Sequence, residues 1–232
     1  IGDSFTAGHG IKNIKFRVSN LVDQKLQDFS VINISRNGAD TRLEYEMMLS
    51  FIEESKIKPL KIVLQYFGND IDKAAIRNGL NFSRLEKDHN HVLKHLISSS
   101  CAINYFYWQY PPTGKNNYLE FLKKAYSDSS VFDEHLKDLD RFISFSKEKN
   151  VELIVLIYPF LQNLRFSNDL YINKISMYLH SKKVKTLNVS KSIESFKKSD
   201  ILINSSDSHP SVLVNKVVSE KLASILKTPN NF

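Results

Sequence analysis

Four short runs of apolar residues, separated by long amphipathic stretches, constrain the fold of this chain more than any other feature. The runs cover residues 29–35, 61–67, 151–159 and 184–189. Each is rich in Val and Ile and is bounded by polar or turn residues, a pattern that is typical of buried strands. They lack the alternation of apolar and polar residues that marks a half-exposed sheet, so we expect both faces of the sheet to be covered.

Helical patterns fill the intervals between these runs. They cover residues 15–27, 41–55, 132–149, 169–182 and 211–226. Strands that alternate with helices favour an α/β fold with a parallel sheet. The glycine turn at Gly2 is of a kind that normally follows a strand, so we also expect a first strand upstream of Ile1. The sheet is then expected to have about five strands.

Size and composition favour a single domain over residues 1–232. With 42% hydrophobic and 25% charged residues, the composition is that of an ordinary globular protein, and no repeat or low-complexity linker divides the chain. The connection between the second and third apolar runs is too long for a simple crossover. We therefore predict a helical insertion around residues 84–128, which carries the aromatic run YFYWQYPP near the site.

Composition also limits the partners. The longest strongly apolar run, LIVLIYPFL, has nine residues and contains a proline, so no integral membrane segment is expected. The net charge of +7 comes from lysines spread over the expected helix ends, which favours solvated helix ends over a nucleic-acid surface. Cys101 is the single cysteine, and the chain begins inside a motif, so the sequence leaves the redox compartment and the localisation open.

Polar residues of catalytic type follow the expected strands. Ser4 follows the first, Gly38 the second and Asn69 the third, at the edge where parallel α/β sheets bind their ligands. A serine nucleophile needs an imidazole as base, a group that orients the imidazole, and donors for the oxyanion. His209, directly before Pro210 at an expected helix start, can supply the imidazole, and the nearest carboxylate is Asp207. The amides of Ser4 and Gly38 and the side chain of Asn69 are the candidate oxyanion donors.

Other interpretations of these motifs are weaker. GDSFT lacks the second glycine of the G-x-S-x-G elbow, and GHGIKN completes neither a dinucleotide fingerprint nor a phosphate loop, so no cofactor is expected. His91 and His95, with His89 nearby, favour a solvated helix face, and no metal site is expected. Asp207 or Ser208 as a helix cap, and Asn69 as a turn former, stay open when each is taken alone.

Four blocks in order, GDSFTAG, SRNG, GND and DSHP, make the chain resemble the SGNH hydrolases, the GDSL-type esterases and lipases. The resemblance covers nearly the whole chain. It implies a three-layer α/β/α sandwich, with Ser4 as nucleophile, His209 as general base, and Ser4, Gly38 and Asn69 as the oxyanion hole. It also implies hydrolysis of an acyl ester, which we expect to be a small acyl group such as acetyl on a carbohydrate.

One departure from the family pattern concerns the acid. The family commonly has it three residues before the histidine, where this chain has Ser206, and Asp207 lies one place closer. We expect Asp207 to be the third member, with a backbone carbonyl and a Ser–His dyad as the alternative. Functional alternatives are an acyltransferase to a sugar, a lipase or thioesterase of the same family, and an α/β binding module without catalysis.

Overall fold

A parallel sheet forms the centre of the molecule. The computed structural model describes residues 1–26, 28–81, 91–109 and 115–228. Its three strands, β1 (Lys61–Tyr66), β2 (Glu152–Ile157) and β3 (Lys185–Asn188), are all parallel and lie in the order β1-β2-β3. The middle strand β2 is buried at every residue, which agrees with its continuous apolar sequence.

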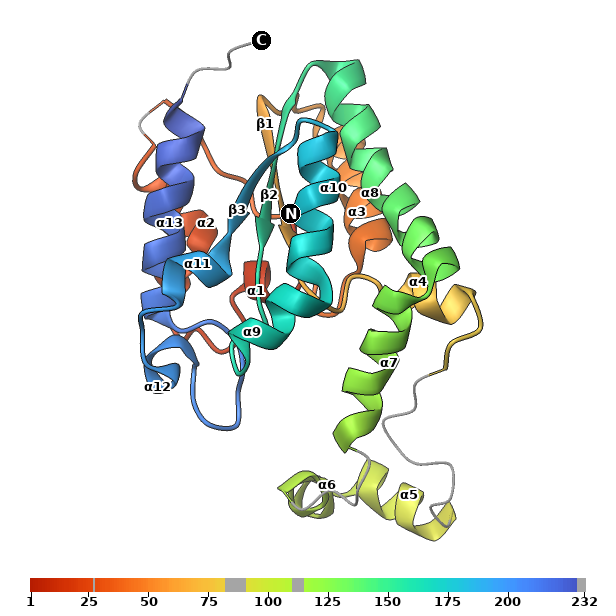
Figure 1. Cartoon of the computed structure of the whole chain (residues 1–232). Helices are drawn as coiled ribbons and strands as arrows, with labels where there is room; N and C mark the ends of the chain where they lie inside the picture. The colour runs from red at the N-terminus through yellow and green to blue at the C-terminus, as the bar shows by residue number, and fades with distance from the viewer. Residues whose placement is uncertain (27, 82–90, 110–114, 229–232) are drawn as a thin grey trace.

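Helices cover both faces of this sheet, as Figure 1 shows, with α3, α8 and α10 on one side and α2, α11 and α13 on the other. Successive side chains of a strand point to opposite faces. In β2, Val155 and Ile157 accordingly join one apolar core and Ile154 and Leu156 join the other. The expected α/β sandwich with a parallel sheet is confirmed.

The helices form two sets, those that cover the sheet and those that are shorter or belong to insertions. The covering helices are α2 (Val18–Asp23), α3 (Thr41–Ser55), α8 (Ser129–Lys149), α10 (Asn173–Ser181), α11 (Val189–Ile193) and α13 (Val212–Lys227). Shorter helices and insertions are α1 (Ser4–Ala7), η1 (Ile14–Phe16), α4 (Asp72–Arg77), α5 (His91–Ser99), α6 (Cys101–Gln109), α7 (Lys115–Ser127), α9 (Leu164–Ser167), η2 (Asn168–Ile172) and α12 (Lys198–Ile201).

The sheet continues beyond β1 through two extended segments that are not full strands. The Ile1 ammonium donates to the Val63 carbonyl (2.7 Å), and Gln65 N donates to the Ile1 carbonyl (2.9 Å). On the other side, Gly2 forms an isolated parallel bridge with Ser35. The strand predicted over residues 29–35 is therefore wrong except at this bridge, because among the described residues only Gly2 pairs with it.

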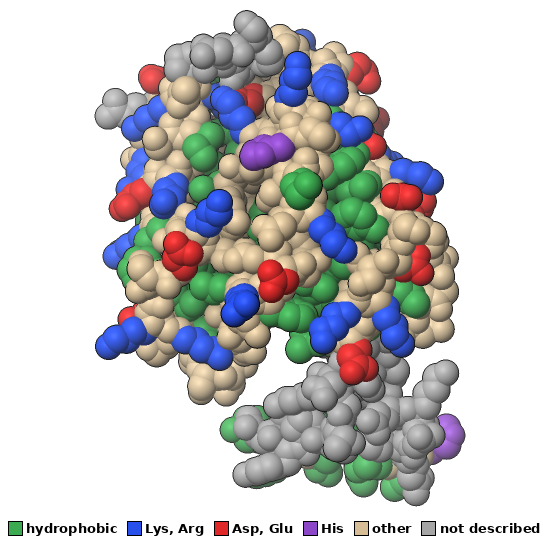
Figure 2. Space-filling model, in the orientation of Figure 1, with side chains coloured by type: hydrophobic (Ala, Val, Ile, Leu, Met, Phe, Trp, Pro, Cys, Tyr) green, Lys and Arg blue, Asp and Glu red, His purple; other side chains and the backbone are tan. Residues whose placement is uncertain are grey.

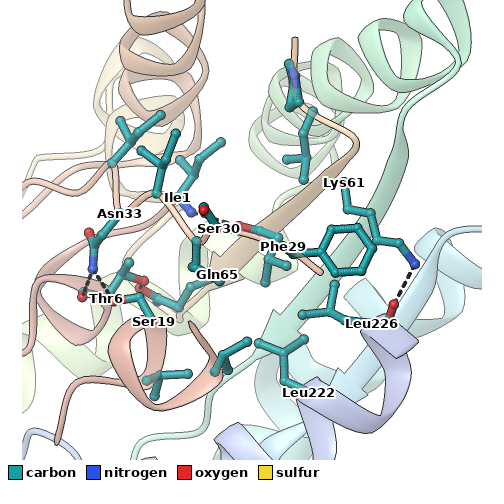
Figure 3. A pocket seen from close by; sticks show the side chains of 18 of the residues that line it. Ile1, Thr6, Ser19, Phe29, Ser30, Asn33, Lys61, Gln65, Leu222 and Leu226 are labelled. Atoms are coloured by element: carbon teal, nitrogen blue, oxygen red, sulfur yellow. Dashed lines mark hydrogen bonds between the residues drawn. The ribbon is translucent and has the colours of Figure 1, made fainter. Parts of the chain in front are cut away.

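A cavity of about 450 Å³ lies between residues 29–34 and β1 (Figure 3). Its apolar walls come from both helix layers, for example Met48 of α3 on one side and Leu226 of α13 on the other. It is therefore a space at a strand position of the sheet, in line with Ile1. The expected upstream strand stays a prediction.

The helical insertion forms α5, α6 and α7, and Figure 1 shows α5 and α6 projecting away from the sheet. The predicted insertion also includes residues 84–90 and 110–114, which lie outside the described residues. Tyr105 and Phe106, in the described part of the aromatic run, contact each other with ring centroids 5.6 Å apart. Their exposed fractions are 61% and 63%, so both rings face solvent.

Charges of both signs are mixed on the face in Figure 2, where Lys and Arg side chains lie among Asp and Glu. Basic residues lie in the last turns of several helices, including Lys149 in α8 and Lys227 in α13, where they complement the helix dipole. None of the described helices combines the length and the apolar character needed to cross a bilayer.

Candidate active site

Ser4 begins the short helix α1, directly after the buried residue Asp3. Asp3 is the N-cap of this helix, and its Oδ1 accepts a hydrogen bond from Phe5 N (2.8 Å). The amide of Ser4 is at the first helical position, where no intrahelical acceptor exists. The cap thus satisfies Phe5 N and leaves the Ser4 N–H for another acceptor.

Gln65 ties this turn to the central sheet. Its Oε1 accepts from Asp3 N (3.1 Å) and from Thr6 Oγ1 (3.1 Å). The backbone of Gly2 passes so close to these groups that a Cβ there would lie 2.2 Å from Thr6 Oγ1. Neither Gln65 nor Asp3 was predicted to have a role, because their contacts depend on the pairing of residues 1–2 with β1.

The loop before α13 places His209. Leu202 and Pro210 form an isolated antiparallel bridge, and Ile203 N donates to the His209 carbonyl (3.0 Å). The prediction that Pro210 begins the last helix is wrong, because the backbone of Pro210 is in this bridge. α13 begins at Val212, and its N-cap is Ser211 rather than Asp207 or Ser208.

Ser4, His209 and Asp207 form a continuous chain of hydrogen bonds. His209 Nε2 lies 2.9 Å from Ser4 Oγ, and His209 Nδ1 lies 2.6 Å from Asp207 Oδ1. The same Oδ1 accepts from His209 N (3.0 Å), and Asn204 Oδ1 accepts from Asp207 N (2.8 Å). This tight loop brings a carboxylate only two residues before the histidine to its imidazole.

The electrostatics of Asp207 agree with an ionised acid. Partial burial raises the pKa of Asp207, but the hydrogen bonds from the backbone and ring of His209 outweigh it and hold the pKa below its usual value. The carboxylate is therefore charged at neutral pH.

Two rings border the imidazole of His209. The buried ring of Phe5 makes an edge contact with it (centroids 5.3 Å apart). The exposed ring of His9, which follows α1, lies against it on another side (4.4 Å). The sequence predicted no role for His9, since α1 ends at Ala7 and the left-handed backbone of its C-cap Gly8 (φ 74°) redirects the chain.

Asn69 lies in the turn after β1 and reaches the nucleophile turn. Its Nδ2 donates to Asp3 Oδ2 (3.4 Å), which leaves its second N–H for another acceptor. The turn is held by the Tyr126 hydroxyl, which donates to the Gly68 carbonyl (3.2 Å). A Cβ on Gly68 would lie 2.7 Å from the ring of Phe160, so only glycine allows this approach.

Gly38 lies in the turn that follows the bridge of Gly2 and Ser35. Its φ of 72° is in the left-handed region, which favours glycine, and a Cβ there would meet no atom of the described residues within 4 Å. The bridge places this turn at the same edge of the sheet as Ser4. Its role as an oxyanion donor stays a prediction.

Buried carboxyl groups lie beneath the site. Glu44 is fully buried, and within the described part of the chain neither of its carboxyl oxygens, nor Asp70 Oδ1, has a hydrogen-bond partner. Burial, and then the negative charges of the neighbouring carboxyl groups, raise the pKa of Asp70 and of Glu44 well above the usual range. The site therefore rests on acids that favour the protonated form.

This cluster predicts an unusual pH dependence of stability. A carboxyl group with a raised pKa in the folded state holds a proton that the unfolded chain has lost, so the free energy of unfolding falls as pH rises above about 4. The variant Asp70→Asn is expected to gain stability relative to the parent from pH 5 to pH 8. For one proton the difference grows by at most about 1.4 kcal/mol per pH unit.

Urea unfolding at pH 5, 6.5 and 8 measures this difference. The side-chain oxygen of the introduced asparagine can still accept the hydrogen bond that Phe67 N donates to Asp70 Oδ2 (2.8 Å) in the parent. The exposed Asp169→Asn is the matched control, and its unfolding free energy should run parallel to that of the parent. A difference for Asp70→Asn that stays constant across the three pH values would contradict the prediction.

Solved structures of similar fold were found, although no family model and no curated protein matches the sequence. A protein described as lipolytic, of the G-D-S-L family, from Desulfitobacterium hafniense aligns over 97% of this chain and 96% of its own, with a TM-score of 0.57 and 14% identity. The psychrotrophic esterase EstA from Pseudoalteromonas, inhibited by monoethylphosphonate, aligns over 98% and 97% (TM-score 0.54, 13% identity). A lipolytic protein of the G-D-S-L family from Veillonella parvula aligns over 98% and 96% (TM-score 0.54, 10% identity). The chain therefore has the fold of these proteins.

Proposed function

We propose that this chain is a serine hydrolase that cleaves acyl esters through an acyl-enzyme. The observation that carries the proposal is the hydrogen-bond chain from Ser4 Oγ through His209 (2.9 Å) to Asp207 (2.6 Å). Ester hydrolysis by a serine nucleophile requires a base and an orienting acid within hydrogen-bond reach, and this arrangement provides both. The structural neighbours, which are described as an esterase and as lipolytic proteins, support the same reaction.

The proton path follows from these contacts. His209 Nδ1–H donates to Asp207, so Nε2 has the free electron pair that accepts the Ser4 proton during attack on the carbonyl carbon. The protonated ring then gives this proton to the leaving alcohol. In the second half, His209 takes a proton from water, which attacks the acyl-enzyme and releases the acid and Ser4.

The oxyanion of each tetrahedral intermediate needs donors that are fixed in advance. We assign this role to the Ser4 N–H, the Gly38 N–H and the second N–H of Asn69. The bond from Asn69 to Asp3 and the contacts of the Gly68 turn hold the amide in place without reorganisation.

Asn69→Ala is expected to lower kcat about 100-fold to 1,000-fold with little change in KM, as removal of one oxyanion donor does in other enzymes. The reason is that the amide binds the transition state more strongly than the ground-state carbonyl. Steady-state kinetics with an aryl acetate measure the effect. Asn78→Ala, at the end of α4, is the control: it removes an amide side chain from the same connection and should keep the parental kcat. Equal losses of kcat in both variants would contradict the assignment of Asn69 as an oxyanion donor.

For the substrate we propose a small acyl group, such as acetyl, on a carbohydrate. In the described part of the chain the 450 Å³ cavity is lined by neither Ser4 nor His209, so we do not assign the acyl group to it. A carbohydrate alcohol is supported by the exposed rings of Tyr105 and Phe106, which are free to stack on a sugar face.

Two measurements test the proposal. The first is labelling of the purified protein by a fluorophosphonate, which should modify the parent and leave Ser4→Ala unlabelled. The second compares hydrolysis of acetyl, butyryl and long-chain aryl esters with release of acetate from acetylated sugars. Absence of labelling together with absence of hydrolysis would mean a binding module without catalysis, and a long-chain preference would mean a lipase.

The same assay separates hydrolysis from acyl transfer. Addition of a free sugar to the aryl acetate reaction should leave acetate as the main product if the chain is a hydrolase. Formation of acetylated sugar faster than acetate would identify an acyltransferase that uses the same three residues.

A further inference from the structure

A second histidine turns the catalytic loop into a cluster of metal-ligating groups. His9, Asp207 and His209 each offer one ligand atom, and these atoms lie within 4.8 Å of one another. No other set of three or more His, Cys, Asp or Glu among the described ranges meets this condition. His9 is exposed, and the side chains of Asp207 and His209 keep 23% and 24% of their surface exposed, so a cation can reach the cluster from solvent.

We propose that His9, Asp207 and His209 bind a divalent transition-metal cation such as Zn²⁺, and that the bound cation reversibly stops ester hydrolysis. The inhibitory part rests on the proposed function, whereas the binding part does not. The proposed reaction itself uses no metal, so the cation acts as a regulator of the site.

The donor set fits the chemistry of Zn²⁺. Two imidazoles and one carboxylate are a common three-residue set for zinc, with water in the fourth position. Tetrahedral bonds of about 2.0–2.2 Å place neighbouring donor atoms roughly 3.3–3.6 Å apart. A separation near the 4.8 Å limit must therefore shorten by about 1 Å, which rotation of the exposed His9 side chain can supply, whereas the 2.6 Å contact of Asp207 Oδ1 with His209 Nδ1 must lengthen if these two atoms are the ligands.

Geometry also explains why a bound cation would stop the reaction. A metal at His209 Nδ1 takes the position of the proton that Asp207 accepts, and the single proton of the neutral ring must then be on Nε2, which faces Ser4. A metal at Nε2 takes the electron pair directly, and the proton stays on Nδ1. In either case the neutral ring keeps its one proton, but Nε2 has no electron pair left to accept the proton of Ser4.

The test measures binding and inhibition separately. Titration with Zn²⁺ at pH 7.5 should inhibit hydrolysis of an aryl acetate by the parent protein, and EDTA should restore the activity. In His9→Gln the Zn²⁺ concentration for half inhibition, relative to the activity of that variant without metal, should rise tenfold or more. His180→Gln, which removes an exposed histidine of α10, is the matched control and should behave as the parent does.

Metal binding is followed without any activity by the visible absorption of Co²⁺ and by calorimetry with Zn²⁺. The parent and His180→Gln should show a tetrahedral Co²⁺ band that His9→Gln lacks. If the parent has this band but no esterase activity, the metal site stands and the proposed function fails. If half inhibition and the Co²⁺ spectrum are the same in His9→Gln and the parent, the metal proposal is overturned.

Discussion

Ser4→Ala should lower kcat for hydrolysis of an aryl acetate by about 10⁴-fold to 10⁶-fold, the loss that follows removal of a triad nucleophile. The alanine removes the atom that forms the acyl-enzyme, while the oxyanion donors and His209 stay in place. Any residual rate must come from water activated by His209. Burst kinetics with an aryl ester, which report the acyl-enzyme, should lose their burst in the variant.

The control for this variant is a serine from the same loop cluster. Ser208 is next to His209 in sequence, and its Oγ accepts a hydrogen bond from Gln162 Nε2 (2.5 Å) rather than from the imidazole. Ser208→Ala should keep kcat within a few-fold of the parent. The thermal midpoint of Ser4→Ala should match that of the parent, since among the described residues the Ser4 hydroxyl has His209 as its one hydrogen-bond partner. The midpoint of Ser208→Ala should match it as well, since the bond that this variant loses is exposed. Retention of most activity by Ser4→Ala would refute the nucleophile assignment.

The sequence was sufficient to predict those elements whose signal is local. β2 is a continuous run of six buried residues, and its short length and β-branched residues favour a strand over a buried helix. Helix α3 has the predicted bounds because Asp40 caps its start, with Oδ1 accepting from Leu43 N (3.3 Å). These features need no knowledge of distant parts of the chain.

Other elements depended on partners far away in the sequence. Residues 29–35 have the composition of a strand, but a ladder also needs a neighbour, and in the described part of the chain only Gly2 pairs with this segment, at Ser35. Pro210 is a residue type that is favoured at helix starts, but its backbone forms the bridge to Leu202, and α13 begins after it. In both cases tertiary pairing decided the outcome against local propensity.

The residues of the site also differ in whether the sequence could predict them. Parallel strands end at one edge of the sheet, so the positions of Ser4 and Asn69 after their strands were sufficient to predict that they meet near the base. The support of these residues was not predictable, because Asp3 and Gln65 meet only through the pairing of the first residues with β1. No sequence motif links His9 to His209, because the two residues are 200 positions apart in the chain. Only the fold brings their rings to a centroid distance of 4.4 Å.

Asp207→Asn is the second variant with a large expected effect, and it decides between a triad and a dyad. In the parent, one carboxylate oxygen, Asp207 Oδ1, accepts from both His209 N and His209 Nδ1. An asparagine whose oxygen takes this position keeps both bonds and the shape of the loop, but it is neutral and does not stabilise the positive charge that the ring gains with the Ser4 proton. If the amide nitrogen takes this position instead, it donates to Nδ1 and the ring proton moves to Nε2, and the comparable change in a serine protease lowers kcat about 10⁴-fold.

We expect a somewhat smaller loss of kcat for Asp207→Asn, about 100-fold to 10,000-fold, because the side chain of Asp207 is 23% exposed and water can partly replace the carboxylate. KM should change little, since Asp207 acts on the proton transfer and not on substrate binding. Asp200→Asn, an exposed change in α12, is the control and should keep parental kcat. If Asp207→Asn stays within threefold of the parent, the 2.6 Å contact to Nδ1 is not what orients His209. The catalytic unit would then be a Ser4–His209 dyad, with the ring held by its contacts to Phe5 and by the bridge of Leu202 and Pro210.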